Sequence, residues 1–173
     1  MTAIACAAGR IAHHRAVRAL LIVCLLAGAA MADGGARVAK GYRSGRPMKL
    51  RVVAVDGADV EVSTARAFRA MRRAAARAGV GLKIASGFRT YARQAELYRE
   101  WRRGTGHRAA RPGYSNHQAG HALDLSLDAA GIAWLRRNAR AFGFHRTVPG
   151  EPWHWEFLGM PRRTARAAPQ RRR

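Results

Sequence analysis

Apolar and polar residues alternate along the middle of the chain with two different periods, which predicts both strands and helices. An Asp56-Gly57 pair separates the first two runs of strand-like alternation. This pair tolerates the positive φ angles of a tight hairpin turn. The later apolar runs are short, as is expected of buried strands. The predicted strands span residues 50–55, 58–62, 80–88, 122–127 and 153–158.

Apolar residues at helical spacing predict three helices among these strands. The first follows Ser63 or Thr64, either of which is placed to cap it, and ends at Gly79. The other two span residues 91–103 and 129–141. Interspersed strands and helices with an early hairpin predict an α+β fold, in which helices flank an antiparallel sheet.

The first 32 residues have the layout of a secretory signal peptide. A basic start precedes a short apolar run at residues 19–27, and Ala30-x-Ala32 then stands before Asp33. The apolar run is too short to span a membrane comfortably, which favours cleavage over the alternative of an uncleaved membrane anchor. Composition divides the chain into a signal peptide (1–32), a flexible leader rich in Gly, Arg and Lys (33–49), one compact domain (50–159) and an arginine-rich tail (160–173).

The chain is strongly basic, with 32 Lys+Arg against 10 Asp+Glu and a formal net charge of +22. Both cysteines, Cys6 and Cys24, lie in the predicted signal peptide, so a disulfide framework or a cysteine-ligated zinc site is excluded for the rest of the chain. Cleavage after Ala32 leaves 29 basic and 10 acidic residues, a net charge of +19, and an exported protein of this charge meets anionic surfaces such as cell-wall polymers, lipid headgroups or nucleic acid. We expect a monomer in the periplasm or cell wall, without a stable membrane anchor after cleavage.

Histidines and acids cluster in two places, which bring together His117, Asp124 and His154 as candidates for one site. Two imidazoles and one carboxylate are a normal set of protein ligands for catalytic zinc, which keeps a fourth position for water. Zinc lowers the pKa of that water and so produces a nucleophile near neutral pH. Glu151 stands three residues before His154 and is close enough to act as the general base.

The residues alone leave a plainer interpretation open, because histidines and acids also occur as ordinary core or surface residues. His117 and His121 are spaced i, i+4 and would chelate a metal themselves if they were helical. Gly120 and the apolar run after it indicate instead that a loop passes into a strand here.

Several separated motifs occur in a characteristic order. They are Ser86-Gly87-Phe88-Arg89-Thr90, Ser115-Asn116-His117-Gln118-Ala119-Gly120 with Ala122 and Asp124, Phe142-Gly143-Phe144, and Glu151-Pro152-Trp153-His154. This ordered set resembles the VanY-type D-alanyl-D-alanine carboxypeptidases, which belong to a group of zinc peptidases that shares its fold with the hedgehog signalling domain. The resemblance covers about residues 50–159.

The resemblance implies a hedgehog/DD-peptidase-like fold and zinc as the cofactor. It also implies that an arginine steadies the negative charge that develops on the scissile carbonyl, as directed N–H donors do in many hydrolases. The implied site consists of His117, Asp124 and His154 as metal ligands, Glu151 as general base, Arg89 at the oxyanion, and Ser115 and Gln94 at the substrate. Capping and helix-surface roles remain alternatives for the last two residues. His121 departs from the family pattern, and the arginine-rich tail has no place in it.

The implied function is a D,D-carboxypeptidase that removes a terminal D-alanine from peptidoglycan stem peptides at an anionic cell wall. An endopeptidase of the same group is an alternative, because both activities share one metal mechanism. A non-catalytic basic domain that binds wall polymer or nucleic acid is a second alternative. Its arginines lack the interleaved aromatic platform of proteins that bind single-stranded nucleic acid, so we expect no specific nucleic-acid partner.

Overall fold

The computed structural model describes residues 35–161 of the 173-residue chain. The predicted signal peptide and residues 162–173 of the predicted tail lie outside the described residues. In the part that is described, no helix has the length and apolar character needed to cross a membrane. The elements are β1 (Arg37–Arg43), β2 (Arg46–Val55), β3 (Ala58–Glu61), α1 (Val62–Arg77), β4 (Lys83–Ser86), α2 (Tyr91–Arg102), β5 (Ala122–Ser126), α3 (Ala129–Asn138), a 3-10 turn η1 (Ala139–Phe142), β6 (Phe144–His145) and β7 (His154–Phe157).

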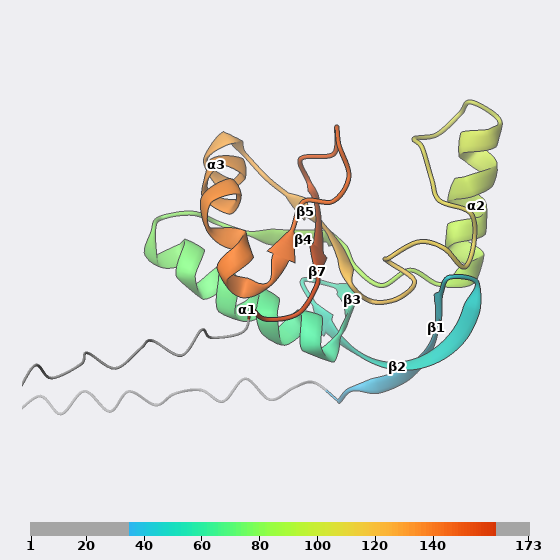
Figure 1. Ribbon diagram of the computed structural model, residues 1–173, viewed down its shortest axis with the longest axis horizontal. Helices are drawn as coiled ribbons and strands as arrows, with labels where there is room; N and C mark the ends of the chain where they lie inside the picture. The colour runs from blue at the N-terminus through green and yellow to red at the C-terminus, as the bar shows by residue number, and fades with distance from the viewer. Residues whose placement is uncertain (1–34, 162–173) are drawn as a thin grey trace, which may run out of the picture. The chain divides into compact units, whose positions relative to one another are not determined.

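The strands form two antiparallel sheets. The first has the order β1-β2-β3 and the second the order β4-β5-β7-β6. Helices α1 and α3 lie on one side of the second sheet, whereas α2 stands apart, beside the β1–β2 hairpin (Figure 1). The predicted α+β fold with an antiparallel sheet and flanking helices is therefore confirmed, as are the approximate positions predicted for α1, α2, α3, β4, β5 and β7, whereas β6 was not predicted.

Alternation within β5 separates the core from the other face of the sheet. Leu123 and Leu125 are buried in one cluster with Phe68 and Met71 of α1, while Asp124 between the two leucines is only partly buried. Successive side chains of a strand point to opposite faces, so the packing of the leucines directs Asp124 away from the core. Each buried side chain of this size contributes about 1.5–3 kcal/mol, which strongly specifies this register.

The predicted hairpin at Asp56-Gly57 is present, with β2 and β3 paired on either side of it. Both turn residues have positive φ, 55° at Asp56 and 83° at Gly57, as a two-residue hairpin turn with the twist of its strands requires. The Asp56 carboxylate also accepts hydrogen bonds from the Ile84 amide (3.0 Å) and the Arg72 guanidinium (2.7 Å). The turn therefore links the two sheets and α1.

The predicted flexible leader is wrong from Arg37 onward, because residues 37–43 form β1 and pair along their whole length with β2. The inward-facing positions of β1 are Ala39 and Gly41, which carry too little apolar surface to give a visible alternation. The ordered domain therefore begins before residue 50.

The β1–β2 hairpin lies against the loop that carries His117. The Tyr42 amide donates to the Gln118 carbonyl (2.9 Å), and the Gly45 amide donates to the Gly113 carbonyl (2.8 Å). A Cβ atom on Gly41 would come within 2.6 Å of the Gln118 carbonyl oxygen, so only glycine permits this close approach. The hairpin thus supports one of the two predicted histidine clusters.

The predicted N-cap of α1 is wrong by two or three residues. The cap is Glu61, whose carboxylate accepts from the amides of Ser63 (2.9 Å) and Thr64 (3.0 Å). The Thr64 hydroxyl donates instead to the Gly120 carbonyl (2.9 Å) and joins the helix to the end of the His117 loop. Burial raises the pKa of Glu61, but the hydrogen bonds from Ser63 and Thr64 outweigh burial and lower it below its ordinary value.

Replacement of Glu61 by alanine should lower the free energy of unfolding by about 1 kcal/mol, the usual cost of losing an N-cap acceptor. Because the folded-state pKa is lowered, the cap stabilises fully above the ordinary pKa of 4.5 and loses its effect as the pH falls through the folded-state value. Urea unfolding of both proteins at pH 7 and pH 3 measures this, with Glu96→Ala as an exposed control. An equal deficit at both pH values would contradict the assignment of the cap.

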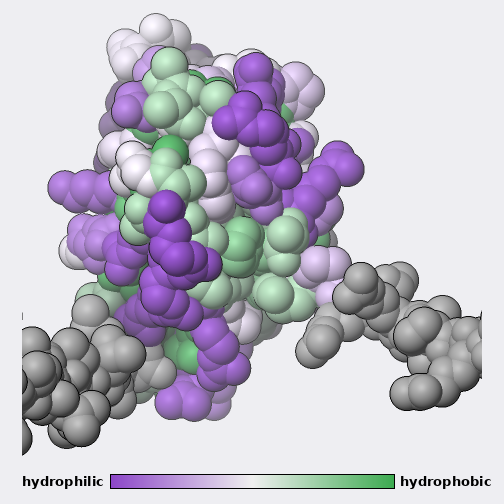
Figure 2. All heavy atoms as spheres, turned by 90° about the vertical axis from the view of Figure 1, so that its left-hand side faces the viewer, coloured by the Kyte–Doolittle hydropathy of each residue, from purple (hydrophilic) through white to green (hydrophobic). Residues whose placement is uncertain are grey.

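The face that carries α3 and the end of α1 is largely hydrophilic, with apolar atoms showing between the polar groups (Figure 2). Exposed arginines on these elements include Arg66, Arg73, Arg77, Arg136 and Arg137. Like charges on a solvated surface repel one another and keep proteins apart in solution. The basic composition is therefore carried by the surface, outside the packed core.

Candidate metal centre

Strand register brings Asp124 and His154 together. In the antiparallel pair of β5 and β7 these two residues are direct partners, and Ser86 of β4 lies opposite Asp124 on its other side. Side chains of directly opposed residues have Cβ atoms about 4.5–5.5 Å apart, on the same face of the sheet. The face of β5 that the core leucines leave free is therefore the face on which the site is built.

His117 reaches the same face from the loop between α2 and β5. A turn in this loop is closed by a hydrogen bond from the Gln118 amide to the Ser115 carbonyl (3.0 Å). The Arg89 amide donates to the His117 carbonyl (3.2 Å), and His117 Nδ1 lies 2.7 Å from the Gly87 carbonyl oxygen. Backbone and ring are thus both held by the segment that follows β4.

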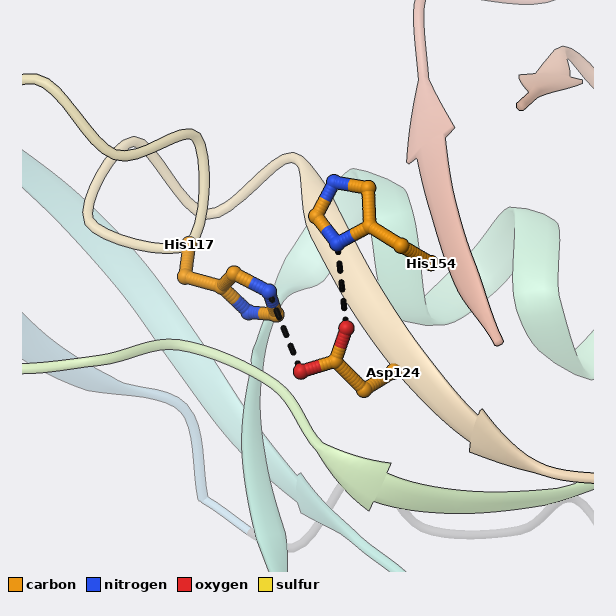
Figure 3. Close-up of side chains that lie close together, drawn as sticks. All are labelled: His117, Asp124 and His154. Atoms are coloured by element: carbon orange, nitrogen blue, oxygen red, sulfur yellow. Dashed lines mark hydrogen bonds and ion pairs between the residues drawn. The ribbon is translucent and has the colours of Figure 1, made fainter. Parts of the chain in front are cut away.

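The three predicted ligands converge, as Figure 3 shows. His117 Nε2 lies 3.3 Å from one Asp124 oxygen, and His154 Nδ1 lies 3.0 Å from the other. One ligand atom from each residue can be chosen so that all three lie within 4.8 Å of one another. Metal–ligand bonds of about 2.0–2.1 Å in a tetrahedral site place neighbouring ligand atoms roughly 3.3 Å apart, close to the distances of the two histidine nitrogens from their Asp124 oxygens.

Hydrogen bonds on the far side of each ring support a metal ion at this point. The Gly87 carbonyl can only accept, so the single N–H of a neutral His117 ring is at Nδ1 and its Nε2 is an acceptor. In that form Nε2 and an Asp124 oxygen are two acceptors 3.3 Å apart, a contact that either a proton on Nε2 or a bound cation would stabilise. On His154, Nε2 lies 3.0 Å from the Glu156 carboxylate and Nδ1 faces Asp124. Carboxylate or carbonyl partners on the outer nitrogen are the usual support of metal-binding histidines.

The two histidines respond differently to this environment. Burial lowers the pKa of His117, and the hydrogen bond to Asp124 does not overcome it. Burial also acts to lower the pKa of His154, but Asp124 and Glu156 on either side outweigh burial and raise it to about 9. Burial likewise opposes ionisation of Asp124, yet hydrogen bonds with both histidines hold its pKa well below its usual range. A cation at the site must displace the proton of His154, because only neutral imidazole binds metal.

Glu156 is a site residue that the sequence analysis did not single out. It is 5% exposed, and its carboxylate oxygen also accepts from the Asn116 side chain (2.9 Å). Burial raises its pKa, but hydrogen bonds from His154 and Asn116 outweigh burial and lower it to about 2. Its position two residues after His154 in a predicted strand was the available signal, because such residues share a face.

Replacement of Glu156 by glutamine should weaken metal binding about 10- to 100-fold, the usual effect of losing the carboxylate behind a ligating histidine. The amide keeps the volume of the side chain but cannot hold the His154 ring with the same charge-assisted bond. Titration of the metal-free protein with Zn²⁺ against a competing chelator gives the affinity. Glu96→Gln, on the exposed side of α2, is the matched control, and equal affinities in the two variants would contradict this role.

Glu151 and Arg89 flank the three ligands. Glu151 lies in the loop before β7, with a carboxylate oxygen 4.0 Å from His154 Nδ1. Arg89 Nη2 lies 3.0 Å from an Asp124 oxygen, and the same nitrogen lies 3.3 Å from the Ser86 hydroxyl. Both predicted catalytic groups therefore lie next to the cluster, Glu151 in the loop before β7 and Arg89 in the segment after β4. Their catalytic roles stay predictions.

Gln94 and Ser115 are held by the protein itself. Gln94 is 1% exposed, accepts from Arg89 Nη1 (3.1 Å) and donates to the Ala110 carbonyl (2.8 Å). Ser115 is buried, and its hydroxyl lies 3.3 Å from the amide of His117. The geometry shows that both residues orient other members of the site, and their contact with substrate stays a prediction.

His121 does not join the cluster. Its Nε2 contacts the Arg43 side chain, and its Nδ1 is buried without a hydrogen-bond partner among residues 35–161. Gly120 has a φ of 77°, which places a loop rather than a helix between His117 and His121 and confirms the predicted passage from loop to strand. Trp155 packs in the core, whereas Trp153 is 44% exposed and lines the cleft above the cluster.

Comparison with known proteins agrees with this arrangement. The D-alanyl-D-alanine carboxypeptidase of Enterococcus faecalis (strain ATCC 700802 / V583) is 32% identical in an alignment 117 positions long, and the match covers 50% of this chain and 44% of that protein. The chain spans less than half the length of the curated relatives that it matches.

Solved structures show the same fold. A variant of the vancomycin resistance D,D-pentapeptidase VanY in complex with Zn(II) is 26% identical, with a TM-score of 0.56 over 64% of this chain and 80% of that chain. The LdcB LD-carboxypeptidase is 29% identical, with a TM-score of 0.52 over 58% of this chain and 60% of that chain. These neighbours confirm the expected hedgehog/DD-peptidase-like fold. The family model for VanY, D-alanyl-D-alanine carboxypeptidase, matches residues 57–160, and since this is more than half of the chain, the chain belongs to that family.

Proposed function

We propose that this chain is an exported, zinc-dependent D-alanyl-D-alanine carboxypeptidase that acts on the stem peptides of peptidoglycan. The observation that carries this proposal is the convergence of His117, Asp124 and His154 within 4.8 Å, with the carboxylate of Glu151 4.0 Å from His154 Nδ1. A purely structural metal site is closed by protein ligands and needs no adjacent base. A three-ligand set with an acid next to it is the arrangement of a hydrolase.

Zinc is the metal that this donor set favours. Two imidazole nitrogens and one carboxylate oxygen suit Zn²⁺ better than Mg²⁺ or Ca²⁺, which prefer oxygen ligands alone. The VanY relative solved with Zn(II) and the VanYB relative solved with D-alanine-D-alanine support the choice of metal and of substrate. Bound zinc would supply Lewis-acid chemistry, which activates water and polarises the carbonyl of the scissile bond.

The protein's own residues supply the proton transfers and the charge balance. Glu151 is placed to accept a proton from the attacking water and to pass it to the departing amino group. Arg89 directs N–H donors into the site and is held there by Gln94 and Asp124. Such donors stabilise the negative charge that develops on the carbonyl oxygen, typically by about 3–4 kcal/mol per donor.

Export and charge fit this substrate. The apolar run at 19–27 followed by Ala30-x-Ala32 is the basis for proposing a cleaved signal peptide. Cleavage after Ala32 removes three arginines and no acids, and the remaining net charge of +19 raises the encounter rate with an anionic cell wall rather than setting which bond is cut.

Incubation of defined muropeptides with zinc-loaded protein and with chelator-treated protein tests the proposal. Mass spectrometry should detect free D-alanine and peptides shortened by one residue, and chelation should abolish both. Release of larger peptide fragments would identify an endopeptidase of the same family instead. Binding that falls steeply with salt, without any hydrolysis, would identify a non-catalytic basic domain.

A further inference from the structure

The cleft above the metal centre is larger than the chemistry requires. It encloses about 1170 Å³ and runs from His117, Asp124 and His154 along α2 to the loop at residues 105–111. Sites for drug-sized ligands usually measure about 300–1,000 Å³. A carboxypeptidase binds only one substrate residue on the C-terminal side of the bond that it cuts. The remaining space is therefore available to the substrate residues that precede this bond.

The outer part of this cleft is lined by exposed aromatic rings. Trp101, Tyr114 and Trp153 are 37%, 49% and 44% exposed, and all three line the cleft. Helix α2 buries only Gln94, and its apolar residues Leu97, Tyr98 and Trp101 line the cleft. Exposed aromatic rings gathered in one cleft are typical of a binding surface.

The outer part of the cleft also carries two arginines, Arg108 and Arg111, that form no ion pair with the described residues 35–161. Arg111 lies over the ring of Tyr114, 4.3 Å from its centre, and this cation–π contact holds the guanidinium at the cleft. In this outer part of the cleft, Glu100 is the acid that stands against Arg108 and Arg111, so the net charge there is positive.

We propose that Arg111, positioned by Tyr114 and assisted by Arg108, binds a free carboxylate of the peptide substrate upstream of the scissile bond. This inference rests on the proposed function, since the upstream direction follows from carboxypeptidase action. A guanidinium fixed on an aromatic ring offers paired N–H donors that match a carboxylate. The outer cleft therefore selects acidic peptides over their amidated counterparts.

Synthetic pentapeptides that end in D-Ala-D-Ala test this selection. One series carries glutamate at each of the three upstream positions in turn, and the matched series carries glutamine. For at least one position the wild-type protein should show a KM about tenfold lower for the glutamate peptide, with kcat nearly unchanged, as expected when one charged hydrogen bond is lost. Equal KM values within all three pairs would overturn the inference.

Variants locate the effect. Arg111→Gln and Arg108→Gln should raise the KM for the acidic peptide and remove most of the preference over the amide. Arg136→Gln, at an exposed position of α3, removes the same charge outside the cleft and should keep the preference. A preference that survives the combined Arg108→Gln and Arg111→Gln change would also overturn the inference. D-alanine release from the glutamine peptides tests the proposed function separately, because it requires no upstream carboxylate.

Discussion

Replacement of Glu151 by glutamine should leave one metal ion per chain and lower kcat for D-alanine release about 10²- to 10⁴-fold. The amide keeps the size of the side chain but cannot accept a proton, and general-base catalysis typically contributes a factor of this size. Glu151 approaches His154 Nδ1 only to 4.0 Å, so its loss should not open the ligand set. Metal content by mass spectrometry and D-alanine release by a coupled assay give the two readouts.

The matched control is Glu96→Gln, which alters an exposed carboxylate of α2 that pairs with Arg93. It should change neither readout. Full turnover in Glu151→Gln would assign the base to another residue. Loss of the metal from the same variant would make Glu151 a ligand rather than a base.

Replacement of His154 by alanine should remove both the metal and the activity. Zinc sites in small domains bind with about 10–16 kcal/mol in total, so one of three ligands is worth roughly 3–5 kcal/mol, or 10²- to 10⁴-fold in affinity. The change also leaves the buried Glu156 carboxylate without one of its hydrogen-bond partners. Metal content after dialysis against a weak chelator, together with circular dichroism, separates loss of the ion from loss of the fold.

His107→Ala is the matched control for metal content, because His107 is exposed and lies outside the cluster. It should retain one ion per chain under the same dialysis. Stoichiometric metal in folded His154→Ala would show that the ion is held elsewhere.

Local signals in the sequence were sufficient for most of the fold. Asp56-Gly57 predicted its hairpin because only a few residue types accept positive φ, and the actual angles are 55° and 83°. The β1–β2 hairpin was missed, although Ser44-Gly45 forms a turn of the same kind with φ values of 51° and 80°. The inner side of β1 carries the small residues Ala39 and Gly41, so the sequence shows no clear alternation of apolar and polar residues that would predict a strand before this turn.

The predicted ligand set depended on residue type and motif order, and the structure brings all three ligands together. The residues that support them were harder to predict because their positions depend on three-dimensional contacts. Glu156 stands behind His154 only because β7 pairs with β5 in one register. Gln94 reaches Arg89 only because the chain turns between β4 and α2.

The attachment of the β1–β2 hairpin to the His117 loop has a consequence for hydrogen exchange. The amides of Tyr42 and Gly45 are bonded to this loop, so they exchange with solvent only when hairpin and loop separate. An ion bound through His117 ties the loop to the sheet and makes that separation rarer. Deuterium uptake at these two amides, which precede the region matched by the family model, should therefore slow when metal is added and report occupancy of the site without any substrate.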